Sequence, residues 1–135
     1  MRARFPVFAA TVFMACAVAG GCGRSDTRPD RKRVAGGSAS RGLAVLEQGT
    51  YGCGGCHAIP GVRGAIGVAG PPLGGMARRG FIAGQLPNTP GNLVAFLQDP
   101  PVFVPGTGMP DVRMGTADAR DVAAYLYTLE PRDGR

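Results

Sequence analysis

The stretch Cys53-Gly54-Gly55-Cys56-His57 constrains this chain more than any other feature of its sequence. Two cysteines separated by two residues and followed at once by histidine have the spacing of a c-type haem attachment site. Thioether bonds from the two thiols would hold the porphyrin, and the histidine would become an axial ligand of the iron. The chain contains a single histidine, and that histidine completes the motif. We therefore predict one covalently attached haem c.

Two other uses of a close cysteine pair fit the sequence less well. A structural zinc site needs four ligands, usually from two Cys/His pairs, and no second pair of that kind is present. A thioredoxin-like redox pair follows a buried strand in a βαβ unit, whereas a helix-like segment precedes Cys53. A dithiol pair or a plain disulfide between Cys53 and Cys56 remains the alternative to haem.

The N-terminal residues have the pattern of an export signal. Arg2 and Arg4 precede a mostly apolar run, residues 5–19, which is shorter than the roughly 20 residues of a membrane-spanning helix. Residues 19–22, Ala-Gly-Gly-Cys, are similar to the lipobox of bacterial lipoproteins, although that family usually has leucine at the first position. We expect a signal peptide over 1–21 and a lipid on Cys22, at the periplasmic face of the cytoplasmic membrane. Cleavage after Ala-Val-Ala instead gives a soluble periplasmic protein.

Residues 22–40 are rich in Arg, Asp, Gly and Ser without an apolar period, so we predict a flexible tether. Its basic run at 31–33, with Arg28, either lies near anionic lipid headgroups or is simply solvated. The net charge of +6 arises from the signal, the tether and the tail at 131–135, because basic and acidic residues balance over 41–130. The basic ones there are Arg41, Arg63, Arg78, Arg79, Arg113 and Arg120, and the acidic ones are Glu47, Asp99, Asp111, Asp118, Asp121 and Glu130. Nucleic-acid binding is therefore not indicated.

The domain over 41–130 is predicted to be all-α, with three main helices and Gly/Pro-rich loops wrapped round one haem. Glycine and proline are dense over 60–75 and 100–115. Those loops have little side chain to bury, and a domain of this size buries a limited share of its surface. A large apolar cofactor would supply the missing core.

Capping residues and apolar periods set the expected helices. The first covers roughly 42–50, with Ser40 as a candidate N-cap. The second follows Thr89 as N-cap, with Pro90 at the first helical position, and stops at Asp99-Pro100. The third opens at Thr116 and continues until Pro131, with Val122, Tyr125, Leu126 and Leu129 on one face. A short helical turn is expected over 74–79, and no strand pair is expected.

The second axial ligand has to be sought among the methionines. With one histidine in the chain, methionine is the obvious donor for the sixth iron position, and methionine ligation raises the potential. Met76, Met109 and Met114 remain after the signal is removed. Met109 lies in a glycine-rich loop, 105–110, whose backbone can approach a flat ring closely, so we predict Met109. Met114 has the features of ordinary core filler.

Four motifs together resemble the class I c-type cytochromes. They are the CxxCH motif, Gly70-Pro71-Pro72-Leu73, Met109-Pro110, and Ala124-Tyr125-Leu126 in the terminal helix. The resemblance implies that the carbonyl of Pro71 accepts a hydrogen bond from His57. It also implies that the first and last helices cross beside the haem, with Gly42 facing the ring of Tyr125.

Residues 83–90, with Asn92-Leu93 and Asp99-Pro100 after them, are similar to the cytochrome c domain fused to subunit II of some bacterial haem–copper oxidases. The similarity covers 42–130. That family usually has tryptophan where Phe96 stands, and its indole N–H is expected to bond a haem propionate. Phenylalanine cannot donate, so the candidates are the arginines Arg63, Arg78 and Arg79. The segment between Gly42 and Cys53 is also longer than usual, which weakens the expected helix crossing.

The function expected from these features is one-electron transfer by an exported monohaem cytochrome c in a respiratory chain. Two filled axial positions leave no place for substrate, so we do not expect an enzyme. The partners would be redox proteins, namely a terminal oxidase or other acceptor and a donor such as a quinol-oxidising complex, meeting the exposed haem edge in a small transient interface. The alternative is a gas- or peroxide-binding haem protein with a labile sixth ligand.

Overall fold

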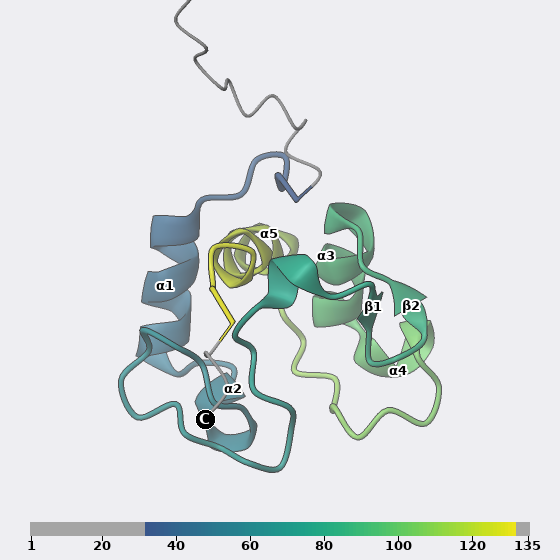
Figure 1. Cartoon of the computed structure of the whole chain (residues 1–135), viewed down its shortest axis with the longest axis horizontal. Coiled ribbons are helices and arrows are strands. Elements are labelled where there is room, and N and C mark those ends of the chain that lie inside the picture. The colour runs from purple at the N-terminus through teal and green to yellow at the C-terminus, as the bar shows by residue number, and fades with distance from the viewer. Residues whose placement is uncertain (1–31, 132–135) are drawn as a thin grey trace, which may run out of the picture.

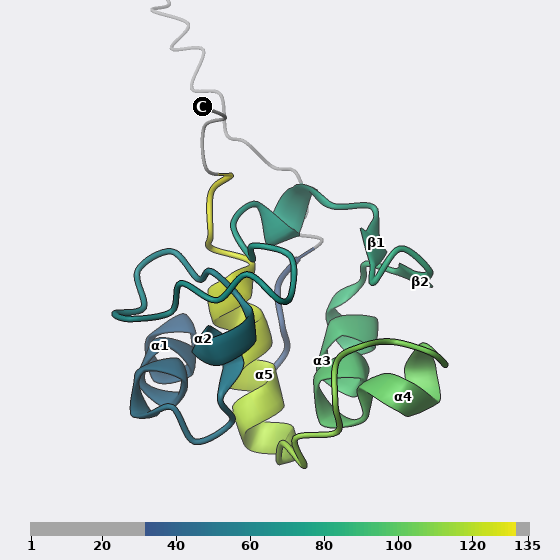
Figure 2. The ribbon, with the colours of Figure 1, turned by 90° about the horizontal axis from the view of Figure 1, so that it is seen from below.

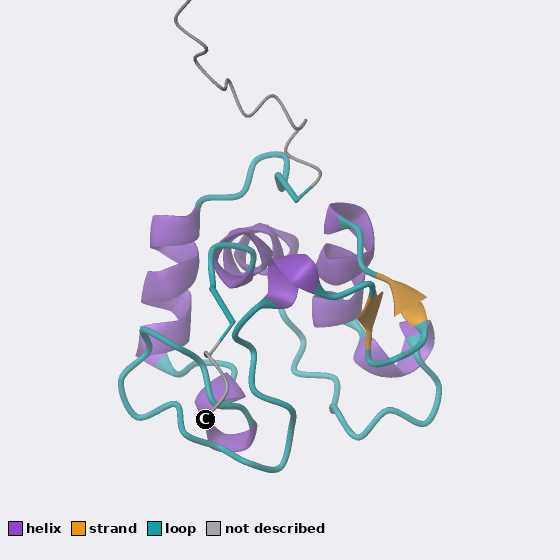
Figure 3. Ribbon diagram, in the orientation of Figure 1, coloured by secondary structure: helices purple, strands orange, loops and turns teal. Residues whose placement is uncertain are grey.

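Helices carry the architecture of residues 32–131, the part of the chain that the computed structural model describes (Figures 1 and 3). In chain order the elements are α1 (Ala39–Gln48), α2 (Cys53–Cys56), the 3-10 turn η1 (Met76–Arg78), β1 (Phe81–Ile82), β2 (Leu86–Pro87), α3 (Pro90–Gln98), α4 (Pro100–Phe103) and α5 (Thr116–Leu126). Three of the helices have nine residues or more, whereas α2 and α4 are single turns of four residues. Long loops join them, so the fold is mainly helical.

Helices α1 and α5 cross closely beside each other, as Figures 1 and 2 show from two directions. The crossing point is Gly42, where a Cβ atom would lie 2.0 Å from the carbonyl oxygen of Asp121 and 3.0 Å from the Cβ of Tyr125. Only a hydrogen atom fits there, because real Cβ atoms do not approach backbone so closely. Gly42 therefore meets the backbone of α5 at Asp121 and the Cβ of Tyr125. The ring reaches further, and its hydroxyl donates to the carbonyl of Pro60 over 2.9 Å.

Helix α1 begins earlier than the sequence predicts. Its N-cap is Ser38 and not Ser40, and the Ser38 hydroxyl accepts from the backbone N–H of Arg41 over 3.4 Å. The reason lies outside the helix, because the backbone N–H of Ser38 donates to the Asp121 carboxylate over 2.7 Å and fixes the chain there. The helix ends at Gly49, whose φ of 71° is a left-handed conformation that glycine adopts without strain.

Helix α3 agrees with its predicted bounds, since Thr89 caps it by accepting from the Asn92 N–H over 3.2 Å. Helix α5 opens at Thr116 as expected but ends at Leu126, well before Pro131. A turn replaces its last residues, in which the Thr128 hydroxyl donates to the carbonyl of Tyr125 over 2.7 Å.

The expectation that the domain has no strand pair is wrong. Strands β1 and β2 pair antiparallel, with Phe81 opposite Pro87 and Ile82 opposite Leu86. Each strand has only two residues, and the turn between them places Ala83 and Gly84 at φ values of 48° and 73°. A ladder this short shows no alternation in the sequence. The helical turn η1 does lie within the predicted range 74–79.

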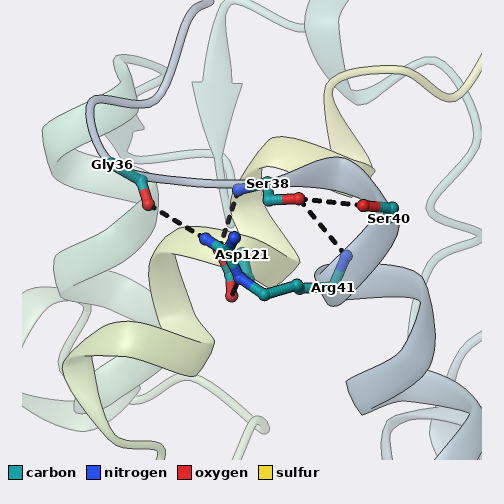
Figure 4. Close-up of polar contacts among 5 residues, drawn as sticks. All are labelled: Gly36, Ser38, Ser40, Arg41 and Asp121. Atoms are coloured by element: carbon teal, nitrogen blue, oxygen red, sulfur yellow. Dashed lines mark hydrogen bonds and ion pairs between the residues drawn. The ribbon is translucent and has the colours of Figure 1, made fainter.

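Residues 32–38 form a strap that crosses α5 before α1 begins (Figure 4). The sequence predicts a flexible tether here, but Val34 is 7% exposed and belongs to the core. A Cβ atom at Gly37 would lie 2.5 Å from the carbonyl of Arg120, so the glycine lets the strap lie directly on the helix. The predicted signal peptide, Cys22 and the rest of the tether and tail, 132–135, lie outside the described residues.

Asp121 ties the strap, α1 and α5 together, as Figure 4 shows. Its carboxylate accepts from Arg41 Nε and Nη2 over 2.7 and 2.8 Å, in a two-pronged ion pair, and from the backbone of Ser38. Arg41 Nη2 also donates to the carbonyl of Gly36 over 3.3 Å. The hydrogen bond from Arg41 lowers the pKa of Asp121, so the carboxylate stays ionised in the folded protein. Within residues 32–131 no helix is long and apolar enough to cross a bilayer.

The glycine at the helix crossing gives a first prediction. Gly42→Ala should lower the free energy of unfolding by about 1–3 kcal/mol or more, because overpacking at a rigid contact forces the helices apart. Gly91→Ala is the matched control, since Gly91 lies in α3 with no atom near its Cβ position. It should raise the free energy of unfolding by about 0.5–1 kcal/mol, because alanine loses less backbone entropy on folding than glycine does. Denaturant unfolding measures both, and equal effects of the two variants would contradict the close crossing.

The ion pair gives a second prediction, on pH. A carboxylate with a lowered pKa in the folded state adds stability above the unfolded pKa, about 3.9, and loses it as the pH falls towards the folded value. Asp121→Asn should therefore lower the free energy of unfolding most at neutral pH. The difference in this free energy between the variant and wild type should shrink below about pH 4. Denaturant unfolding across this range measures the difference. Glu130→Gln removes an exposed carboxylate outside the contact, and the same pH pattern there would refute the assignment.

Candidate functional site

An apolar cavity of about 350 Å³ lies inside the helical frame. Its walls come from all the helices except α4, from η1 and β1, and from the loops after α1, α2 and α4. Among the described residues that line it, Arg79 is the only one with a formal charge, and most of the others are aliphatic or aromatic. The cavity therefore suits a flat apolar group that carries its own polar atoms to the rim.

Helix α2 presents both cysteines to this cavity. Cys53 and Cys56 stand three positions apart in one helical turn, which places them on the same side. Both are free thiols, and both line the cavity together with His57. Burial raises the pKa of the Cys53 thiol, whereas a reactive redox pair depends on a lowered thiol pKa. The raised pKa of Cys53 is the opposite of what thiol–disulfide chemistry requires.

His57 is held by the turn that follows it in the fold. Its Nδ1 lies 2.7 Å from the carbonyl oxygen of Pro71, which is the contact that the family resemblance implies. The ring lies against Gly70, where a Cβ atom would be 2.3 Å from His57 Cε1. The Gly70 N–H donates to the carbonyl of Cys56 over 2.7 Å, so the turn is fixed to the attachment helix. With Nδ1 as donor, Nε2 keeps the lone pair that can bind a metal.

Close backbone contacts also explain the glycines around the motif. A Cβ atom at Gly67 would lie 2.5 Å from the carbonyl of Gly55, and one at Gly54 would lie 2.9 Å from the Cβ of Ala65. The Gly67 N–H donates to the carbonyl of Gly54 over 3.1 Å. The loop after α2 therefore folds back onto the helix, backbone against backbone, and locks the position of both cysteines.

Two methionines line the cavity, and a third does not. Met109 is half-buried in the loop after α4, where its N–H donates to the Thr107 hydroxyl over 3.3 Å. Met76, in η1, is 5% exposed and lines the same cavity. Met114 is 3% exposed and is absent from the lining, as expected for core filler. The structure leaves Met109 and Met76 as the thioether donors within reach of the site.

The arginines proposed to replace the missing indole differ in position. Phe96 is 6% exposed and lines the cavity. Arg79 lines it as well, and its Nη2 donates to the carbonyls of Pro72 and Gly74, the latter over 3.1 Å. Arg63 and Arg78 are exposed and do not belong to the lining. Of the three predicted candidates, Arg79 is the one placed to meet an acidic group in the cavity.

Two further residues of the site have no signal in the residue pattern alone. Asn88 is buried, and its amide donates to the carbonyls of Met76 and Arg79 over 2.8 and 2.9 Å while accepting from the Tyr127 hydroxyl over 2.7 Å. It thereby joins the cavity wall at η1 to the end of α5. Burial raises the pKa of Tyr127 to about 12, so the phenol keeps its proton as donor.

Tyr51 is the second of these residues. It lines the cavity just before α2, and its hydroxyl donates to the Asp118 carboxylate over 2.6 Å, which raises the pKa of Tyr51. The contact fixes the approach to the attachment helix against the first turn of α5.

Comparison with known proteins agrees with this geometry. The family model described as cytochrome c matches residues 39–130, more than half of the chain. A cytochrome c oxidase subunit 2 from Alkalihalophilus pseudofirmus is 37% identical over 93 residues, which cover 68% of this chain and 26% of that protein. The chain thus spans about a quarter of this relative's length, and no solved structure matches. The chain belongs to the cytochrome c family, as a class I cytochrome c whose domain resembles that of the oxidase subunit and whose fold is that of a haem-binding electron carrier.

Proposed function

We propose that this protein is an exported monohaem cytochrome c that passes one electron at a time between redox proteins of a respiratory chain. The observation that carries the proposal is the composition of the cavity. Two thiols and an imidazole from one short segment, together with a methionine from a distant loop, line one apolar space of about 350 Å³. When bound there, haem c supplies a ferric/ferrous couple. Cys53 and Cys56 would hold it covalently.

His57 and Met109 are the proposed axial ligands. The carbonyl of Pro71 accepts from His57 Nδ1, which fixes the tautomer, orients the ring and increases the basicity of Nε2. A thioether as second ligand raises the potential relative to a second nitrogen. The apolar lining excludes water, and a dry site disfavours the more highly charged oxidised state. Arg79 is the proposed partner of a haem propionate, since it is the charged residue of the lining.

Filling both axial positions makes the protein a carrier and not an enzyme. The proposed partners are a terminal oxidase or other acceptor and a donor such as a quinol-oxidising complex. The name of the relative, an oxidase subunit, supports this choice. We also propose that Cys22 carries a lipid, which holds the domain at the periplasmic face of the membrane; the sequence at 19–22 supports this.

Attachment of haem is tested by expressing the full chain with a c-type haem maturation system and extracting it with acidified organic solvent. We expect the haem to stay with the polypeptide and the oxidised protein to show the charge-transfer band of methionine-ligated iron. Carbon monoxide should leave the reduced spectrum unchanged. Haem that washes out would overturn the proposal, and ready binding of carbon monoxide would favour a gas- or peroxide-binding protein.

The methionine ligand gives a third prediction. Met109→Ala should abolish the charge-transfer band and lower the midpoint potential by an amount of the order of 0.1 V, within the roughly 0.8 V that axial ligands span. Met114→Ala is the control, because Met114 is buried outside the cavity, and it should keep the band. Met76→Ala decides between the two lining methionines. Loss of the band in Met76→Ala and not in Met109→Ala would reverse the assignment.

The turn behind His57 gives a fourth prediction. Gly70→Ala would place a Cβ atom on the imidazole ring, so the ring must tilt and the Pro71 contact must lengthen. We expect a shifted midpoint potential and an altered ferric spectrum, measured by redox titration and paramagnetic NMR of the axial histidine. Gly55→Ala is the control inside the attachment motif, since no atom lies near its Cβ position. Equal changes in both variants would contradict the packing of the ring on Gly70.

A further inference from the structure

The strap carries positive charge that the fold leaves unbalanced. Arg33 is exposed on the strap itself, and Arg120 of α5 lies under it, with its Nη1 3.8 Å from the Cβ position of Gly36. Arg41 reaches the same point from α1, donating to the Gly36 carbonyl over 3.3 Å. Cations from α1 and α5 therefore meet at Gly36, and Arg33 lies on the same strap.

Carboxylates are scarce around these cations. Among the described residues the one ion pair is that of Arg41 with Asp121, whose side chain is 8% exposed and faces inward. Arg33 and Arg120 have no carboxylate within ion-pair distance in that part of the chain. A groove of about 800 Å³ lies between the strap, the start of α1 and the end of α5. Its described lining includes Lys32, Arg33 and Arg41 and no acidic residue. We call this surface, with Arg120, the strap face.

The stretch between Cys22, the proposed lipid site, and the strap is short enough to keep a membrane near this face. Lys32 is the point at which the described part begins, and it is fixed there by the carbonyl of Asn88 and the ring of Tyr127, 5.1 Å from its ammonium. From Cys22 to Lys32 is a distance of ten residues, which span at most about 36 Å when fully extended. The same stretch contains three arginines, Arg24, Arg28 and Arg31, against two aspartates, Asp26 and Asp30. A membrane holding Cys22 thus stays close to the strap face.

We propose that the strap face binds anionic phospholipid headgroups, so that the domain rests on the membrane with its haem-attachment helix directed away from it. Figure 1 places the strap and α2 at opposite ends of the molecule. A cation near an anionic leaflet strengthens binding by about fivefold. The orientation leaves the cavity rim open to redox partners. The inference rests on the membrane location in the proposed function, although the charge on this face does not depend on the haem.

The test separates charge from lipid by using the haem-loaded full chain with Cys22→Ser, which cannot be acylated. Sedimentation with phosphatidylcholine vesicles, with and without phosphatidylglycerol, measures the affinity at low and high salt. The variant pair is Arg33→Glu/Arg120→Glu. The charge-matched control is Arg63→Glu/Arg113→Glu, because both arginines lie outside the strap face as defined above.

We expect wild type to prefer phosphatidylglycerol vesicles in a salt-sensitive way, and the strap pair to lose about tenfold or more in affinity. The fold-loss in affinity of the control pair should be less than a third of that of the strap pair. The orientation is measured with lipidated protein on the same vesicles, through quenching of a headgroup fluorophore by the haem. Quenching should be weaker in wild type than in the strap pair, because the bound strap face holds the haem away from the headgroups. Equal losses in the two pairs, or no preference for the anionic lipid, would overturn the proposal. An unchanged haem spectrum in every variant shows that the fold and the haem site are intact.

Discussion

The close crossing of α1 and α5 is the contact on which the rest of the structure depends. Gly42 has no side chain to keep the helices apart, and Asp121, one residue of the same contact, binds the Arg41 guanidinium and the start of α1. Helix α1 leads directly into α2, while α5 supplies Val122 and Leu126 to the cavity wall. The position of the attachment helix relative to the cavity floor is therefore set by one helix–helix approach.

Loops complete the site by packing backbone on backbone. Gly67 and Gly70 press the loop after α2 onto the helix and onto the His57 ring, at distances that admit no Cβ atom. Such contacts need little side chain, which explains how a chain with 23 glycines and 12 prolines still positions a histidine accurately. Tyr125 adds a side-chain contact from α5 to the same loop, by donating to the carbonyl of Pro60. The helices therefore fix the walls of the cavity, and the loops fix the position of His57.

What the sequence predicts well are features encoded by neighbouring residues. Thr89 and Pro90 mark the start of α3 because capping and proline geometry act within one turn. The sequence does not predict the N-cap of α1, because Ser38 is fixed there by a hydrogen bond to Asp121, a residue 83 positions away. The role of Asn88 is likewise invisible, since its partners lie in η1 and at the end of α5. Local rules cannot show contacts of this range.

Charged side chains are unevenly distributed over the described domain, although basic and acidic residues balance in number over 41–130. Residues 64–77, which wrap the attachment helix, contain no charged side chain. They expose Ile66 by 77% and Val68 by 94%, on either side of the glycine that packs against Cys56. Arg33 lies on the strap and Arg120 under it, and neither forms an ion pair within residues 32–131. Figure 1 shows the strap at the opposite end of the molecule from α2. The exposed apolar side chains beside the attachment helix would suit short-range apolar contact, whereas the cations at the strap would suit long-range attraction, so the two proposed encounters would use different surfaces.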